Sequence, residues 1–493
     1  MIRPLTFAFD NTYAAELEGF YARWNGETVP KPRIVHLNRE LAAELSLDAD
    51  ALASETGAAV LSGSEAAEGA TPLAQAYAGH QFGSFSPQLG DGRALLIGEL
   101  IDRDGVRRDL QLKGSGRTPF SRGGDGKAVL GPVLREYLLG EAMHALGVPT
   151  TRALAAVTTG EQIMRQQGLE PGAVLARVAS SHIRVGTFEF FSARGETDKV
   201  RRLADYSIRR HFPDLTDSSD PYLELFREVR DRQASLVAQW MAVGFVHGVM
   251  NTDNVALSGE TIDYGPCAFI DGYDPGAVFS SIDHGGRYAY GNQPAIAQWN
   301  LARFAETLLP LITADDTEQA VQVATTELEA FQPIYQDFWL KGMSAKLGLP
   351  GEEVGDLELV NELHEIMGVQ DVDFTLLFRR LGSAALGDPT EARALFTDPT
   401  AFDIWFGRWR ARTSGEEGSD LRQARAMDEL NPIYIPRNHK VQEALDAATG
   451  GDLEPFRRLL SVLERPFERR AGLQEYEVGA PEDFGPYRTF CGT

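Results

Sequence analysis

Two polar segments in the middle of the chain have the residue types and spacing of a metal site. His247-Gly-Val-Met-Asn-Thr-Asp-Asn254 ends in a carboxylate and an amide, and Asp263-Tyr-Gly265 follows. Mg²⁺ takes one or two protein oxygens and completes its coordination with phosphate oxygens and water. Asn254 and Asp263 are therefore the predicted metal ligands, and a phosphate-bearing molecule is the ligand that they imply.

The same segments resemble the catalytic loop of protein kinases with one carboxylate displaced. Kinases carry H-R-D-x-x-x-x-N followed by D-F-G, and the first Asp accepts the proton of the substrate hydroxyl. When His247 and Asn254 are aligned with this pattern, the catalytic Asp is replaced by Val249, which cannot accept a proton. The nearby carboxylate is Asp253. The chain is thus either an inactive kinase or an enzyme with different chemistry on the same nucleotide.

Glycines and basic residues upstream are candidate phosphate-binding groups. Gly90-Asp-Gly92-Arg93 precedes a predicted strand, although a plain hairpin turn is the simpler interpretation of this segment alone. Residues 113–127 contain four cationic residues and five glycines, which on so acidic a chain indicates anion contact, and a flexible solvated loop is the equal alternative. Asp125 and Gly126 belong to this second loop.

Lys113 and Glu136 match the kinase pair in which a strand lysine contacts the ATP phosphates and a helix glutamate holds it. For an isolated pair, a surface lysine and a solvated glutamate would be the simpler interpretation. Arg177 interrupts an apolar strand, so its guanidinium needs a partner or a wet cleft. Structural ion pairs are the alternative for Arg177 and for Arg184.

Periodicity predicts a β-rich part followed by a helical part. The expected helices are 37–45 with Asn38 as N-cap, 133–146 ended by Gly147, 222–243 and 295–311, and the expected strands are 94–101, 106–113, 151–158 and 173–178. Asp104-Gly105 predicts a two-residue hairpin turn between the first two strands. From about residue 220 the chain is expected to be mostly helical.

This order predicts an α+β, bilobal protein-kinase-like fold with a small β-rich N-lobe and a large α-helical C-lobe. We expect an N-terminal extension at 1–71, a kinase-like N-lobe at 72–215, the catalytic part of the C-lobe at 216–315, and a helical C-terminal region at 316–493. A length of 493 residues is in keeping with several subregions.

Composition limits the partners. The net charge is −24, and so acidic a surface repels nucleic acid and anionic membranes. The N-terminus has no apolar run of the kind found in signal peptides, and no stretch approaches a transmembrane helix in apolar length. We therefore expect a cytoplasmic protein. The two cysteines, Cys267 and Cys491, exclude a disulfide framework and a four-cysteine zinc site.

Longer motifs give the chain a resemblance to the selenoprotein O family, a group of kinase-fold proteins once called pseudokinases. The resemblance covers most of the chain. The motifs that carry it are Tyr77-Ala-Gly-His-Gln-Phe-Gly83, Gln88-Leu-Gly-Asp-Gly-Arg93, Gln111-Leu-Lys-Gly-Ser-Gly-Arg-Thr-Pro-Phe-Ser-Arg122, His247-Gly-Val-Met-Asn-Thr-Asp-Asn254, Asp263-Tyr-Gly-Pro266 and Asp283-His-Gly-Gly-Arg-Tyr288.

The resemblance implies an enzyme that binds ATP in a flipped orientation and transfers AMP to protein Ser, Thr or Tyr hydroxyls, itself included. It implies Mg²⁺, with Mn²⁺ as the alternative, at Asn254 and Asp263, a proton acceptor at Asp253, and Glu136 as the partner of Lys113. The implied nucleotide-binding residues are Gly90, Gly92, Arg93, Lys113, Asp125, Gly126, Arg177, Arg184 and Asp263. A conventional kinase-type phosphotransferase and a catalytically silent nucleotide-binding scaffold remain the alternatives.

The resemblance also suggests a redox pair, because family members can join a C-terminal cysteine to one in the segment after the metal-binding Asp. Cys491 is third from the end, but Cys267 lies only four residues beyond Asp263, and Ser280-Ser281 occupy the later part of that segment. A regulatory Cys267–Cys491 disulfide is one hypothesis, and two unrelated thiols are the other.

Overall fold

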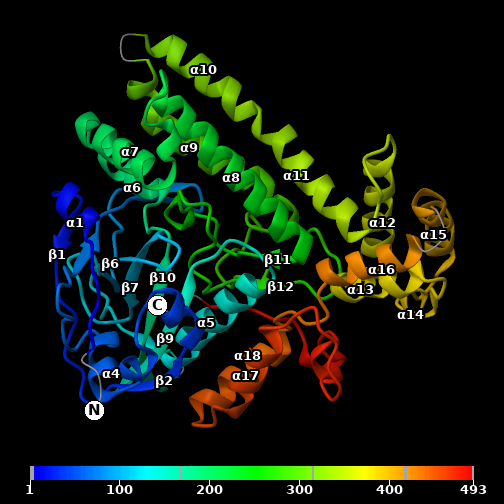
Figure 1. Ribbon diagram of the computed structural model, residues 1–493, viewed down its shortest axis with the longest axis horizontal. Coiled ribbons are helices and arrows are strands. Elements are labelled where there is room, and N and C mark those ends of the chain that lie inside the picture. Colours follow the sequence, from blue (N-terminus) through cyan, green and yellow to red (C-terminus); the bar gives the residue numbers. More distant parts are fainter. Residues whose placement is uncertain (1–4, 167, 314–315, 416–418, 491–493) are drawn as a thin grey trace.

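A computed structural model describes residues 5–166, 168–313, 316–415 and 419–490. It has a β-rich part, built mainly from the first 180 residues, beside a larger helical part (Figure 1). The predicted α+β, two-lobed, kinase-like arrangement is confirmed. Among the described residues, no helix combines the length and the apolar character needed to cross a membrane.

The β-rich part is built on an eight-stranded antiparallel sheet. Seven strands follow the order β1-β3-β6-β7-β10-β9-β2, and β8 pairs with β10. Their bounds are β1 Tyr21–Arg23, β2 Arg33–Leu37, β3 Leu73–Gln75, β6 Ala94–Ile101, β7 Arg107–Lys113, β8 Ala128–Val129, β9 Arg152–Arg165 and β10 Gly168–Ala179.

The register of β7 and β10 sets the two faces of this sheet. Leu110 and Leu112 of β7 are buried in an apolar cluster, and they alternate with Gln111 and Lys113, as predicted. Arg177 of β10 lies opposite Gln111 in the ladder. Gln111, Lys113 and Arg177 therefore lie on the same face of the sheet, which is the face that the helical part covers.

Two details of the strands differ from prediction. The β6–β7 connection is a three-residue loop, residues 103–105, closed by the Asp102 N–H donating to the Val106 carbonyl at 2.8 Å. The Asp102 carboxylate accepts from the N–H groups of Asp104 and Val106 at 3.0 and 2.8 Å, and these bonds favour the larger loop. Gly105 supplies the positive φ of +80°.

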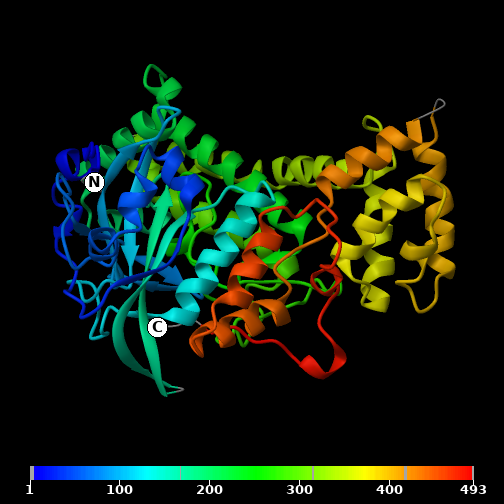
Figure 2. The ribbon, with the colours of Figure 1, turned by 60° about the horizontal axis from the view of Figure 1, so that its bottom comes forward.

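The second difference is that β9 and β10 are longer than the predicted 151–158 and 173–178. They continue as a two-stranded ribbon beyond the rest of the sheet (Figure 2). Met164 and Leu169, which pair across this ribbon, are 66% and 62% exposed. The apolar alternation that marks a half-buried strand is therefore absent there, and pattern analysis missed it.

Helix α5, Leu130–Ala145, lies across the sheet and carries Glu136. It starts three residues before the expected helix, directly after β8, and Gly147 follows its end with φ +80°. The predicted Asn38 cap is confirmed, because its side chain accepts from the Leu41 N–H at 2.9 Å at the start of α2. The other short helices near the N-terminus are α1 Thr12–Glu16, α2 Arg39–Glu44, α3 Ala49–Leu52 and α4 Glu55–Leu61.

The helical part begins before residue 220, earlier than expected, because α6 and α7 already pack in its apolar core. Its helices are α6 Val185–Ser192, α7 Thr197–His211, α8 Pro221–Val243, α9 Gln293–Ile312, α10 Thr317–Glu329, α11 Phe331–Lys346, α12 Asp356–Gln370, α13 Phe374–Ala385, α14 Thr390–Arg393, α15 Thr400–Thr413, α16 Ser419–Leu430, α17 Asn438–Thr449 and α18 Glu454–Leu463. Helices α12–α16 gather at one end of the molecule, whereas α17 and α18 return to pack on α5 (Figure 1).

The segment with the kinase-like motifs lies between two short strands. β11, Phe245–Val246, pairs antiparallel with β12, Ala268–Phe269. The connecting residues 247–267 contain a 3₁₀ turn, Thr252–Asn254, and the predicted metal ligands. This pairing brings the two ends of the connection together, so Asn254 and Asp263 lie in one loop closed by β11 and β12.

Candidate nucleotide and metal site

A cavity of about 460 Å³ lies between the sheet, α5 and the 247–267 segment. Its volume is in the range of small-molecule sites. Every cavity residue expected from the sequence lines it: Gly90, Gly92, Arg93, Lys113, Asp125, Gly126, Glu136, Arg177, Arg184, Asp253, Asn254 and Asp263. Residues separated by up to 173 positions, from Gly90 to Asp263, therefore share one site.

Three cations meet two carboxylates in the lining of this cavity. Lys113 Nζ lies 2.7 Å from Glu136 Oε2 and 2.5 Å from Asp263 Oδ1. Arg177 Nη1 contacts the same two carboxylates at 3.0 and 2.8 Å. Arg184 Nη1 reaches Asp263 Oδ2 at 2.7 Å. The predicted Lys113–Glu136 pair is thus part of a larger buried cluster that has one more positive than negative charge.

Asp263 is the centre of the cluster. Its backbone has φ +64°, in the left-handed region that Asp and Asn tolerate better than most residues. Burial alone would raise the pKa of its carboxyl group, but Lys113, Arg177 and Arg184 hold that pKa well below its ordinary value. The carboxylate is therefore ionised, as a hard metal ligand must be.

Asn254 and Asp253 lie on the 3₁₀ turn opposite the sheet. The Asn254 amide donates to the Val249 carbonyl at 2.9 Å, which orients the amide and leaves its oxygen for a cation. Burial raises the pKa of Asp253 to about 7, although nearby Arg184 opposes the shift. A carboxylate with a pKa near neutrality suits proton transfer at neutral pH.

Both glycine-rich loops contain positions that only glycine can occupy. A Cβ at Gly90, φ +69°, would lie 2.3 Å from the Phe120 ring. A Cβ at Gly126, φ +69°, would lie 2.1 Å from the Gly116 carbonyl oxygen. Asp125 is held by Arg165 Nη1 at 2.8 Å. The two loops therefore present close-packed backbone to the cavity, as phosphate-binding loops do.

Sequence reasoning missed several residues of the site. Asp91 and Tyr77 line the cavity, burial raises the pKa of Asp91 to about 6, and the Arg184 guanidinium lies 4.8 Å from the centre of the Tyr77 ring. Gln81 also lines the cavity. These residues lie inside motifs that carried the family resemblance, so the motifs were the available signal. Local pattern alone gave no reason to select them.

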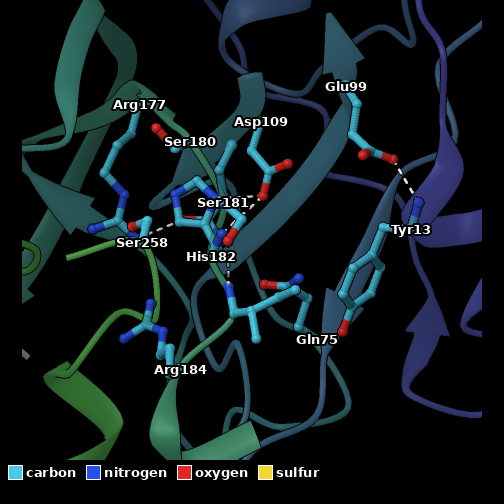
Figure 3. A network of polar contacts seen from close by, with 12 residues as sticks. Tyr13, Gln75, Glu99, Asp109, Arg177, Ser180, Ser181, His182, Arg184 and Ser258 are labelled. Atoms are coloured by element: carbon cyan, nitrogen blue, oxygen red, sulfur yellow. Dashed lines mark hydrogen bonds and ion pairs between the residues drawn. The ribbon is translucent and has the colours of Figure 1, made fainter. Parts of the chain in front are cut away.

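A second buried network holds the segment that carries Arg184 (Figure 3). Asp109 Oδ2 accepts from the His182 N–H at 2.9 Å and lies 3.0 Å from His182 Nδ1. Asp109 Oδ1 pairs with Arg210 Nη2 at 2.6 Å, and Arg210 Nη1 pairs with Glu99 at 2.6 Å. This network ties the turn before Arg184 to strands β6 and β7 and to helix α7.

Cys267 is buried behind the site and does not line the cavity. Its Sγ donates to the Tyr264 carbonyl at 3.1 Å, and burial raises the pKa of the thiol to about 12. The thiolate needed for disulfide exchange is therefore strongly disfavoured in this state. Cys491 lies outside the described residues, so the predicted Cys267–Cys491 pairing stays a hypothesis.

Comparison with known proteins identifies the family of the chain. The model of the family described as "Protein adenylyltransferase SelO" matches residues 4–464. The protein nucleotidyltransferase YdiU of Cereibacter sphaeroides strain KD131 is 62% identical over 490 residues, covering 99% of this chain and 100% of the relative. The proteins of the same name from Mycobacterium sp. strain KMS and Rhodopseudomonas palustris strain HaA2 are 57% and 55% identical, over 99% of both chains in each case. The chain belongs to the protein adenylyltransferase SelO family.

Proposed function

We propose that this protein transfers AMP from ATP to hydroxyl groups of proteins and releases pyrophosphate. The observation that carries the proposal is the convergence of Lys113, Arg177 and Arg184 on Asp263 in the lining of the cavity. Family membership gives the reaction class, and the cluster supplies a physical reason for the position of the phosphates.

The cation cluster favours ATP bound with its β- and γ-phosphates among Lys113, Arg177 and Arg184. Buried, fixed cations stabilise negative charge more strongly than water does, and the charge that develops in AMP transfer lies on the leaving pyrophosphate. The α-phosphorus then faces the 3₁₀ turn with Asp253. The lack of a carboxylate at position 249 does not prevent AMP transfer in this arrangement, because the acceptor hydroxyl approaches the α-phosphorus and not the γ-phosphorus that a kinase acceptor attacks.

Asn254 and Asp263 fit a divalent cation. One offers an oriented amide oxygen and the other an ionised carboxylate. No group of three or more His, Cys, Asp or Glu side chains suited to a metal occurs in the described part of the chain, which agrees with a site completed by phosphate oxygens and water. We propose Mg²⁺, with Mn²⁺ as the alternative; the ion would neutralise charge on the phosphate oxygens.

Asp253 accepts the proton of the attacking hydroxyl in this proposal. The hydroxyl oxygen bonds to the α-phosphorus, the bond from that phosphorus to the bridging oxygen breaks, and pyrophosphate leaves. Acceptors are Ser, Thr or Tyr side chains of other proteins and of this protein itself. Because ATP is the substrate, we assign the activity to the cytoplasm.

Labelled ATP separates the proposal from its alternatives. Purified protein is incubated with Mg²⁺, with and without casein as an acceptor, and with ATP labelled at either the α- or the γ-phosphate. We expect label from α-labelled ATP only, and none in Asp253→Asn. Transfer of γ-label would show a phosphotransferase, and the absence of both labels would show a silent scaffold.

A further inference from the structure

A small hairpin outside the main sheet covers the catalytic turn. Strand β4, Gly79–Gln81, pairs with β5, Ser84–Ser86, in the register His80 opposite Phe85. Phe82 and Gly83 form the two-residue turn with φ +50° and +85°. A positive φ at both positions is the geometry of a type I′ turn. For a bulky residue such as Phe82 it is strained.

The hairpin contacts three consecutive residues of the catalytic segment. The Phe82 N–H donates to the Asn251 side-chain oxygen at 3.0 Å. The His80 N–H donates to Thr252 Oγ1 at 2.7 Å. Gln81 Nε2 donates to Asp253 Oδ2 at 3.4 Å.

Further contacts fix this junction. Glu189 of α6 accepts from Thr252 Oγ1 at 2.5 Å and lies 2.5 Å from His80 Nδ1, so it joins both sides. A Cβ at Gly79 would lie 2.5 Å from Asp253 Oδ1. Tyr288 Oη accepts from the Phe82 N–H at 3.1 Å and donates to Asn251, which holds the strained turn in place. The surrounding contacts therefore determine the hairpin conformation.

We propose that the hairpin of residues 79–86 positions the proton acceptor, with Gln81 as the positioning residue for Asp253. This inference rests on the proposed function, because it assigns Gln81 a task in the same transfer. Gln81 holds Oδ2 of the carboxylate. Oδ1 is buried against Gly79 and has no hydrogen-bond partner among the described residues. The bond from Gln81 to Oδ2 therefore orients this carboxylate within the cavity that both residues line.

The proposal separates ATP binding from transfer. The side chains of Gln81 and Thr252 form no hydrogen bond with Lys113, Arg177 or Arg184 among the described residues. The turn meets the cluster through its backbone, where Arg184 Nη1 donates to the Asp253 carbonyl at 2.6 Å. We therefore expect the loss of either side chain to leave the ion pairs of the cluster in place. Displacing the Asp253 carboxylate by a fraction of an ångström slows proton transfer from the hydroxyl without changing the affinity for ATP. A purely structural hairpin would instead lower stability and affect both quantities together.

The test uses full-length Gln81→Leu, with Ser84→Ala as the matched control from the opposite strand of the hairpin. AMP transfer from α-labelled ATP to casein and to the protein itself gives kcat and the KM for ATP, and thermal melting with and without ATP reports folding and binding. We expect Gln81→Leu to lower kcat about ten- to hundredfold with the KM for ATP within about twofold of wild type. The control should match wild type.

A second pair of variants tests the other contact. Thr252→Val keeps the size of the side chain but removes the hydroxyl between His80 and Glu189, and Thr252→Ser retains it. We expect the valine variant to lose kcat as Gln81→Leu does and the serine variant to keep it. Wild-type kcat in Gln81→Leu, or equal loss of kcat and ATP affinity, would overturn the inference. A wild-type protein that takes up no α-label would refute the proposed function itself.

Discussion

Replacing Asp263 by Asn tests whether the charge of this carboxylate stabilises the three cations that line the cavity. The substitution keeps the side-chain shape, and Asn tolerates the left-handed φ of +64° as Asp does, so backbone strain is unchanged. What it removes is the one charge on which Lys113, Arg177 and Arg184 converge. Among the described residues, Glu136 is then the one carboxylate that still pairs with Lys113 and Arg177, and Arg184 loses its carboxylate partner.

The size of the effect follows from burial. Removing one partner of a buried ion pair costs about 3–5 kcal/mol, because the other charges stay buried without compensation. Unfolding entropy is about 2.1 cal/mol/K per residue, so a chain of 493 residues unfolding as one unit would have about 1 kcal/mol/K. The expected fall in Tm is therefore about 3–5 °C without nucleotide.

Thermal melting in EDTA, with and without ATP, measures the fall in Tm of Asp263→Asn. We expect ATP to raise the Tm of Asp263→Asn more than that of wild type, because its phosphates replace the missing negative charge, while AMP transfer with Mg²⁺ is lost. Asp356→Asn is the control: its carboxylate is buried and pairs with Arg412, and it is not part of the cavity lining. It should transfer AMP normally. An Asp263→Asn protein that melts at or above wild type without nucleotide would refute the reasoning.

Three further outcomes are expected. Gly126→Ala should weaken ATP binding at least about tenfold by calorimetry, because its Cβ would meet the Gly116 carbonyl. Gly123→Ala is the control, because Gly123 also has a positive φ, +89°, but open space around it, and this variant should bind ATP normally. Burial lowers the pKa of Lys346 to about 7. Between about pH 7 and pH 10 the unfolded chain binds one more proton than the folded chain, so the free energy of unfolding rises with pH. Urea titrations at several pH values should show this rise in wild type and its loss in Lys346→Met. Chelation of divalent metal ions should stop AMP transfer, but ATP should still raise the Tm, because the cationic side chains proposed to bind the phosphates remain. If chelation also abolished the rise in Tm, the metal ion would be needed for ATP binding as well.

Local sequence was sufficient for much of the framework. Alternation predicted the two faces of β7, and the cap at Asn38 and the glycine at Gly147 predicted helix ends, because these signals depend on neighbours within a few residues. The β9–β10 ribbon was missed because its exposed apolar residues carry no burial pattern. The three-residue β6–β7 loop was missed because Asp104-Gly105 by itself indicates a two-residue turn, whereas the hydrogen bonds of the Asp102 side chain select the larger loop.

The motifs, through the family resemblance that they carry, predicted twelve of the residues that line the cavity but missed Tyr77, Gln81 and Asp91. Only the tertiary structure decided how those residues act on one another. Asp263 is ionised because the fold brings Lys113, Arg177 and Arg184, which are distant in the sequence, into contact with it. Coulomb energies depend on distance and burial, which only the tertiary structure sets. Burial likewise sets the pKa of Asp253, and the β4–β5 hairpin gives that carboxylate its orientation, because no local pattern records which segments a fold brings together.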